Sequence, residues 1–234
     1  MGIKGLVTVI LPAHNEEQAI TPCLKGVFSY QQDVRNLGFD LEVLVVNNAC
    51  TDQTSQLARQ AGAIVVDEPR KGYGSALKRG LAEAKGDILI LMDADCSYPP
   101  GMIVGMVAQI RDSDKKAIFT DRLSIECEGM TPANKFGNQF QAHLMHFLTG
   151  IKFTDSQSGM MAFRRSVLYD LLGQGSGMEF CQQTKVRIAK RHEFTEIPIN
   201  YQKRVGKRKF RLFRDGTKNF FFQFFEGFRS RIAG

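Results

Sequence analysis

The 234-residue sequence has few cysteines, and they follow neither a metal-binding nor a disulfide pattern. They are scattered and odd in number, and no two have the CxxC spacing: Cys23, Cys50, Cys96, Cys127 and Cys181. This arrangement argues against a zinc site and against a disulfide framework. It is typical of a reducing cytosol, so we expect a cytoplasmic protein.

Long apolar segments and targeting signals are also missing from the sequence. No apolar run is long enough to cross a bilayer. The N-terminus enters an apolar strand at residues 6–11, where a secretory signal would have a different pattern. We find neither internal repeats nor a low-complexity linker. The length therefore suits one large α/β domain.

Acidic residues are absent from one strongly basic segment. From Lys203 to Arg214, seven of twelve residues are Lys or Arg, and the whole chain has a net charge of +7. Such a block suits nucleic acid, an anionic membrane surface or a phosphorylated substrate. Charge alone leaves these three partners open.

The most informative stretch that is present is GDILILMDADCSYPP, residues 86–100. The apolar run Ile88–Met92 predicts a strand buried on both faces, and Pro99-Pro100 end it before a helix. Asp93 and Asp95 follow the strand directly, at the edge where open α/β sheets bind ligands. Their hard oxygens suit Mg²⁺ or Mn²⁺. The alternative is that they only cap the next helix.

Strand and helix patterns alternate through the first half of the chain. This alternation predicts right-handed crossovers and a mostly parallel sheet covered by helices on both faces. Asn15 is the expected N-cap of the first helix, and Thr51 or Asp52 that of the second. The expected strands cover residues 6–11, 40–47, 61–69, 88–92 and 115–123.

The second half predicts helices over residues 134–148 and 178–190, a short strand after Gly159 and a final strand over 194–201. The last segment, residues 215–231, is basic and rich in phenylalanine, with five of these residues close to one helical stripe. This stripe either packs on the sheet or lies on a membrane surface.

Several motifs together resemble a known family. The order VILPAHNEE, VVNNACTDQT, GYGSALKRGLAEAKGD and LMDADCSYPP resembles the inverting family-2 glycosyltransferases with the GT-A fold. TDSQSGMMAFRR and EIPINYQKRVGKRKF are similar to the branch of dolichyl-phosphate mannose synthases and polyprenyl-phosphate glycosyltransferases. The resemblance implies a Rossmann-like GT-A domain over residues 1–214, followed by an amphipathic helix over 215–234. Within the domain it implies a nucleotide-sugar half (1–123) and an acceptor half (124–214).

The resemblance also implies residues that bind the donor. The base and ribose would contact Pro12, Ala13, His14, Asn15 and Glu16. Asn47 and Asn48 stand where the family carries Asp-Asp or Asp-Asn, so a carboxylate acceptor for a base N–H is missing. Lys71, before the GYG turn, is a candidate phosphate ligand. Ribose and diphosphate would contact Asp93, Ala94 and Asp95, and the metal would bind Asp93, Asp95 and Ser97, with Asp95 as the principal ligand.

On the catalytic and acceptor side, the resemblance places Arg122, Arg204 and Lys209 around the diphosphate. Asp155 and Ser158-Gly159 fall in the loop that meets the acceptor, and Asp155 is the candidate proton acceptor for an alcohol. Two further positions depart from the family pattern. Arg208 replaces a serine, and Gln183 replaces a glutamate in the acceptor-side helix, with Glu179 one turn earlier.

These residues predict a metal-dependent, inverting glycosyltransferase. It would move a sugar from a UDP- or GDP-sugar to a polyprenyl phosphate. The enzyme itself would bind peripherally to the anionic, cytoplasmic surface of a membrane. One alternative is a soluble transferase that uses a small alcohol or a phosphorylated acid. Another is a non-catalytic protein that binds a nucleotide or nucleic acid, although the sequence contains no stacking platform or nucleic-acid recognition motif.

Overall fold

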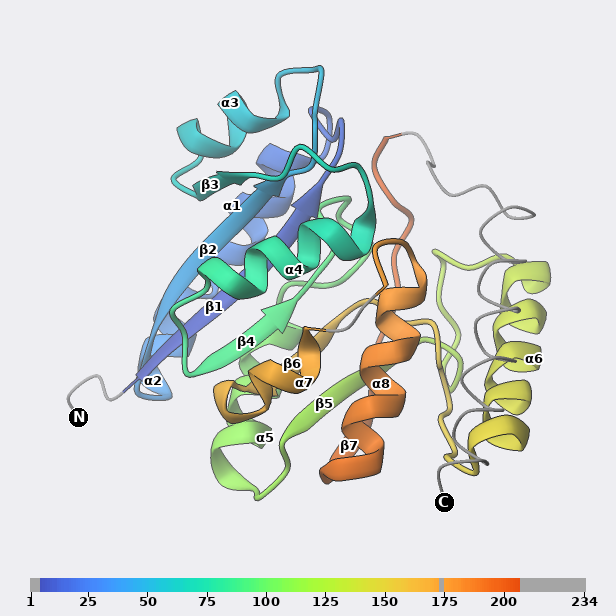
Figure 1. Cartoon of the computed structure of the whole chain (residues 1–234). Coiled ribbons are helices and arrows are strands. Elements are labelled where there is room, and N and C mark those ends of the chain that lie inside the picture. Colours follow the sequence, from blue (N-terminus) through green and yellow to red (C-terminus); the bar gives the residue numbers. More distant parts are fainter. Residues whose placement is uncertain (1–4, 173–174, 207–234) are drawn as a thin grey trace.

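A computed structural model describes residues 5–172 and 175–206, which form an α/β structure around one seven-stranded sheet (Figure 1). The strand order is β3-β2-β1-β4-β6-β5-β7. The strands are β1 (Gly5–Ala13), β2 (Phe39–Asn47), β3 (Ile64–Asp67), β4 (Ile88–Leu91), β5 (Ala117–Asp121), β6 (Met161–Arg164) and β7 (Phe194–Pro198).

Most strand pairs in this sheet are parallel, as predicted. β1 is parallel to β2 and β4, β2 to β3, and β5 to β7. β6 is antiparallel to both neighbours, β4 and β5. The alternation of strands and helices did not reveal this reversed strand, because the apolar pattern of a buried strand carries no direction.

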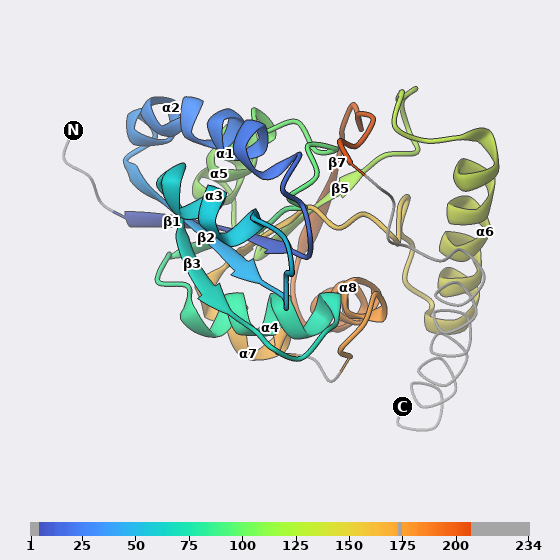
Figure 2. The same ribbon diagram turned by 90° about the horizontal axis from the view of Figure 1, so that it is seen from above.

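Helices cover both faces of the sheet, which confirms the predicted layers (Figures 1 and 2). One face carries α1 (Ile20–Ser29), α2 (Gln31–Asn36), α3 (Thr54–Gln60) and α5 (Met102–Asp112). The other carries α4 (Tyr73–Glu83), η1 (Arg165–Val167), α7 (Leu168–Leu171) and α8 (Glu179–Arg191). Helix α6 (Pro132–Thr149) stands at the side of the molecule, as both views show.

The central strand β1 joins the two halves of the core. Val9 and Leu11 pack toward α1 and α5, whereas Ile10 packs toward α4. A Cβ at Gly80 of α4 would lie 2.3 Å from Ile10 Cγ2, so glycine allows α4 to approach the sheet closely. This approach fixes α4, whose first residue is Tyr73, against β1 and β2.

The helix starts differ in part from the prediction. Asn15 is not an N-cap, because α1 begins at Ile20 and Asn15 has a φ of 54°. Its side-chain oxygen instead accepts a hydrogen bond of 2.8 Å from the N–H of Thr51 and so joins the first two loops. Asp52 accepts a bond of 3.0 Å from the N–H of Thr54, the first residue of α3, although Gln53 occupies the N-cap position.

The expected helix over residues 215–234 and the basic residues from 207 onward lie outside the described residues. No helix within residues 5–172 and 175–206 is both long and apolar enough to cross a membrane.

Candidate active site

Three loops at the carboxyl ends of β1, β2 and β4 meet at one edge of the sheet (Figure 1). Each contains a non-glycine residue with positive φ: Asn15 at 54°, Ala49 at 51° and Cys96 at 64°. Such conformations cost free energy and persist where surrounding contacts hold them. The parallel strands therefore present a set of tightly held loops at the edge where ligands bind in this class of sheet.

Asp95 is held in place by Ser97 and Arg204. It is buried, and one carboxylate oxygen accepts bonds from the backbone N–H and the hydroxyl of Ser97, the former at 3.0 Å. The other oxygen lies 3.2 Å from Nη2 of Arg204. Ser97 thus orients Asp95, and Arg204 places a guanidinium beside it.

Asp93 lies in a different electrostatic environment. The hydroxyl of Tyr73 donates a 2.7 Å hydrogen bond to Asp93 Oδ1. Burial and the negative charge of Asp95 raise the pKa of Asp93 to about 7. Among the described residues, no Lys or Arg forms an ion pair with Asp93. Two carboxylates with incomplete charge compensation are a suitable environment for a divalent cation.

Asn48 connects the loops that follow β1, β2 and β3. It is buried, its amide donates to the carbonyls of Glu68 (3.1 Å) and Arg70 (2.8 Å), and its oxygen accepts from the N–H of Gly72 (2.9 Å). Its own carbonyl accepts a 2.7 Å bond from Nδ1 of His14. Asn48 therefore fixes the turn that carries the exposed Lys71 at this edge.

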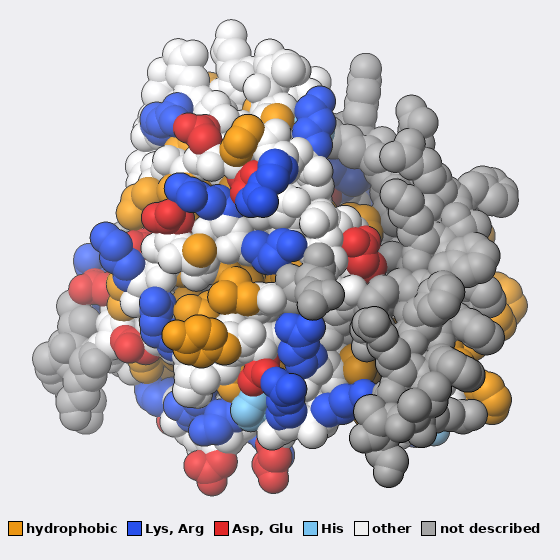
Figure 3. Space-filling model, viewed as in Figure 1, with side chains coloured by type: hydrophobic (Ala, Val, Ile, Leu, Met, Phe, Trp, Pro, Cys, Tyr) orange, Lys and Arg blue, Asp and Glu red, His pale blue; other side chains and the backbone are white. Residues whose placement is uncertain are grey.

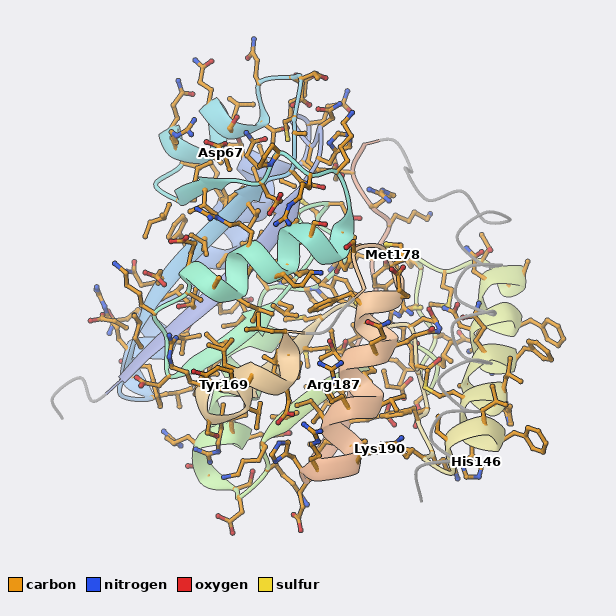
Figure 4. All side chains as sticks on the ribbon, viewed as in Figure 1. Asp67, His146, Tyr169, Met178, Arg187 and Lys190 are labelled. Carbon is orange, nitrogen blue, oxygen red and sulfur yellow. The ribbon has the colours of Figure 1, made fainter. Side chains whose placement is uncertain are left out.

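Asp67, at the end of β3, is a candidate residue that the sequence reasoning missed. Asn47 Nδ2 donates a 2.7 Å hydrogen bond to Asp67 Oδ1, while Asn47 Oδ1 accepts a 3.0 Å bond from the N–H of Cys50. Asn47 and Asp67 are register partners in neighbouring parallel strands. A carboxylate is therefore present beside Asn47, but it comes from the next strand; Figure 4 labels Asp67. The available signal was the position of Asp67 at the end of a predicted strand.

Arg122, directly after β5, and Asp155 form a buried ion pair. Nε of Arg122 lies 2.6 Å from Asp155 Oδ2, Nη2 lies 3.0 Å from Oδ1, and the Asp155 side chain is 0% exposed. Despite its burial, the positive charge of Arg122 lowers the pKa of Asp155 to about 2. Lys185 of α8, also buried, donates a 2.6 Å bond to the Asp155 carbonyl. A carboxylate with this pKa is a weak base at neutral pH, so the expected role of proton acceptor does not fit its position.

The chain after β7 crosses the acidic motif. The N–H of Gln202 donates to the carbonyl of Ser97 (2.8 Å), and that of Val205 donates to the carbonyl of Asp95 (2.9 Å). Between them, Arg204 reaches both Asp95 and Glu16, the latter at 3.4 Å. These contacts bring Arg204 to the loops after β1 and β4, whereas Lys209 lies outside the described residues.

The loop that contains Ser158 and Gly159 packs against the same motif. The N–H of Gly159 donates a 2.7 Å bond to the hydroxyl of Tyr98, and Ser158 bonds the hydroxyl of Thr120. A Cβ at Gly159 would lie 2.9 Å from the hydroxyl of Tyr73, which holds Asp93. Glycine at this position therefore permits the close approach of the two loops.

Gln183 and Glu179 of α8 form hydrogen bonds to the loop that precedes this helix. Gln183 Oε1 accepts a 2.9 Å bond from the N–H of Gly175, and Glu179 Oε1 accepts one of equal length from Gly177. The carbonyl of Ser176 in this loop accepts a 3.2 Å bond from the N–H of Ser75. Both side chains therefore hold the loop that contacts the first turn of α4.

Residues 8–172 match the family model described as Glycosyl transferase family 2. The chain belongs to this family. This family-2 glycosyltransferase is 30% identical over 221 residues to the low-salt glycan biosynthesis hexosyltransferase Agl6 of Haloferax volcanii. The alignment covers 93% of this chain and 52% of Agl6. The chain therefore spans about half the length of that relative.

Two further likenesses concern the whole domain. The glycosyltransferase is 28% identical over 213 residues to the dolichyl-phosphate hexose transferase of the same organism, covering 90% of this chain and 89% of that protein. Its structure matches glucosyl-3-phosphoglycerate synthase from Mycobacterium tuberculosis, solved with Mn²⁺, UDP and phosphoglyceric acid, with a TM-score of 0.74. That match covers 97% of this chain and 78% of the synthase at 21% identity, and it confirms the expected GT-A fold.

Proposed function

We propose that this family-2 glycosyltransferase moves a hexose from a nucleotide diphosphate to a polyprenyl phosphate at a membrane surface. The observation that carries the proposal is the 3.2 Å pair between Arg204 and Asp95 in the loop after β4. It supports a site in which Arg204 would contact the diphosphate beside carboxylates that would hold a metal. The name of the dolichyl-phosphate relative, which this chain covers almost completely, supports the acceptor class.

The donor would bind across the loops after β1, β2 and β4, within residues 1–123. Pro12, Ala13, His14, Asn15 and Glu16 would line the base and ribose, with Asn47 and Asn48 next to them. Asp67 would supply the carboxylate that Asn47 lacks. Ala94 would contact the ribose, and Lys71 would meet a phosphate.

Asp93 and Asp95 would hold Mg²⁺ or Mn²⁺, since their carboxylates lie two residues apart in the loop directly after β4. Such an ion, when bound, stabilises negative charge on the leaving diphosphate. Because the Ser97 hydroxyl already donates to Asp95, Ser97 would act chiefly by orienting that carboxylate. Arg204, together with Lys209, would add positive charge where the leaving group becomes more negative.

The acceptor side, within residues 124–214, favours a nucleophile that is already ionised. An alcohol needs a base to remove its proton, and the Asp155 carboxylate is buried, paired with Arg122 and only weakly basic. A phosphate monoester carries at least one negative charge at neutral pH and needs no such base. We therefore assign Asp155 a positioning role for Arg122, which lies at the end of the nucleotide-sugar half and would add positive charge at the diphosphate.

The test is nucleoside-diphosphate release from UDP-, GDP- and dTDP-sugars, with Mn²⁺ or Mg²⁺ and with or without a polyprenyl phosphate. We expect release that requires both the metal and the lipid phosphate, and loss of release in Asp95→Ala. Full activity of that variant, or in EDTA, would refute the metal role. A further arm with 3-phosphoglycerate tests the soluble acceptor: release with it, and none with the lipid, would overturn the proposed acceptor class.

A further inference from the structure

The outer face of helix α6 carries an exposed row of rings. Phe136, Phe140 and Phe147 are 72%, 56% and 70% exposed, and His143 lies between the last two. These positions follow the spacing i, i+4, i+7 and i+11, which places them on one side of a helix. The buried residues of α6, Ala142 and Met145, lie on the other side. The row therefore faces away from the core, and Figure 3 shows hydrophobic side chains along this edge of the molecule.

This helix face is unusual because it carries almost no charge. The sequence of α6, PANKFGNQFQAHLMHFLT, contains one lysine and no acidic residue, and Lys135 is only partly exposed. Helix faces that contact bulk water usually carry several charged residues. Helices that lie at a membrane interface expose an apolar face that can carry Phe.

Hydrogen bonds connect α6 to the acceptor side of the site. Gln141 Oε1 accepts a 3.1 Å bond from Gln182 Nε2 of α8. One turn further along α8, Lys185 donates to the carbonyl of Asp155, the partner of Arg122. The chain also runs from the end of α6 at Thr149 into the loop of Asp155 within a few residues. A surface that contacts α6 is therefore close to the loop that would receive the acceptor.

We propose that α6 lies in the interfacial layer of a phospholipid bilayer, with the rings of Phe136 and Phe140 among the acyl chains. This orientation presents the Arg122–Asp155 side of the site to the membrane. The choice of a bilayer as the occupant rests on the proposed function, because this face adjoins the loop that would receive a lipid-linked acceptor.

The chain contains no tryptophan, so a single one gives an unambiguous fluorescence signal. We would compare Phe140→Trp with the matched control Tyr169→Trp, since Tyr169 on α7 is 89% exposed and lies on another part of the molecule (Figure 4). The probe is a vesicle of phosphatidylcholine and phosphatidylglycerol, with or without brominated acyl chains. We expect a blue shift and bromine quenching for Phe140→Trp alone. If the protein sediments with vesicles while the emission of Phe140→Trp stays unchanged, the proposal is overturned. It is also overturned if the emission is already blue-shifted without vesicles and analytical sedimentation shows a dimer.

A second measurement uses Phe136→Ser/Phe140→Ser against Tyr169→Ser. We expect vesicle affinity to fall about tenfold or more in the double variant alone. Turnover with a short, water-soluble polyprenyl phosphate should equal that of the unmodified protein, while turnover with a long-chain acceptor in vesicles falls. Undiminished vesicle binding by the double variant would overturn the role of α6 and leave the proposed reaction intact. Absence of turnover with every lipid phosphate would instead refute the proposed reaction, and the vesicle results would still decide the role of α6.

Discussion

Asn47 and Asp67 lie side by side at the ends of β2 and β3, with a hydrogen bond of 2.7 Å from the amide to the carboxylate. The N–H of Cys50 fixes the amide orientation by donating to Asn47 Oδ1. The donor edge thus contains a carboxylate beside the amide pair, although the sequence after β2 reads Asn-Asn. The parallel register of β2 and β3 sets Asp67 directly beside Asn47.

Exchange of these two side chains tests whether Asp67 contacts the base of the nucleotide. We expect Asp67→Asn to raise the KM for the donor about fivefold with little change in kcat, because one hydrogen bond is worth about 1 kcal/mol. Asn47→Asp should also impair binding, since it puts two carboxylates together, whereas Asn47→Asp/Asp67→Asn should restore it. Steady-state kinetics measure this, with the exposed Asp114→Asn as control. An unchanged donor KM in Asp67→Asn would rule out the contact.

Arg204 and its exposed neighbour Lys203 offer a test position and a control position for the proposed contact with the diphosphate. Arg204 reaches Asp95 and Glu16, whereas Lys203 is exposed. We expect Arg204→Ala to lower kcat by about 10²–10³, the usual effect of losing one group that stabilises developing charge. Lys203→Ala should leave kcat near that of the unmodified protein. Equal loss in the two variants would indicate a general electrostatic effect of the basic segment.

The Arg122–Asp155 pair should contribute to stability as well as to the site. Removing one partner leaves a buried charge uncompensated, so Asp155→Asn should lower the free energy of unfolding at pH 7 by about 3–5 kcal/mol. Urea unfolding measures the change. The control is Asp112→Asn, which removes a solvent-exposed ion pair with Arg111 and should have little effect. Similar losses in both variants would contradict the importance of burial.

The same pair predicts a pH dependence of stability. The folded-state pKa of Asp155 is lowered to about 2, below the ordinary value of about 3.9. The unfolded state therefore binds the proton more tightly, and the stabilisation is complete above pH about 4. It is lost as the pH falls from about 4 to about 2, and Asp155→Asn should lack this component in acid titrations of unfolding. An identical acid dependence in the variant would contradict the assignment.

Asp93 predicts a pH dependence of stability opposite in sign to that of Asp155. Its folded-state pKa is raised to about 7, so the metal-free native state binds a proton more tightly than the unfolded chain. Stability should fall as the pH rises from about 4 through about 7. In EDTA at pH 8, Asp93→Asn should be more stable than the unmodified protein, by on the order of 1–4 kcal/mol, and the gain should vanish near pH 4. Urea unfolding at both pH values, with Asp114→Asn as control, measures it; a loss of stability at pH 8 would contradict the raised pKa.

Local patterns in the sequence were sufficient for most of the strands and for the place of Asp93 and Asp95 in the fold. Apolar runs such as Ile88–Met92 predict buried strands because residues close in sequence determine which side chains a strand buries. Aspartates directly after such a run must lie at the carboxyl edge of the sheet. The sequence alone therefore predicted that Asp93 and Asp95 lie at the carboxyl edge of a mostly parallel sheet. The parallel pairing of β1 with β2 and β4 confirms this position.

Contacts between distant segments were decided only by the tertiary structure. The sequence carries no signal that Asp67 lies beside Asn47, that Asp155 is neutralised by Arg122, or that β6 runs antiparallel between β4 and β5. Arg204 meets Glu16 across 188 residues of sequence. The charge environment of a side chain depends on such neighbours, which explains why the sequence named Asp155 as a base and the folded chain makes it an ion-pair partner with a pKa of about 2.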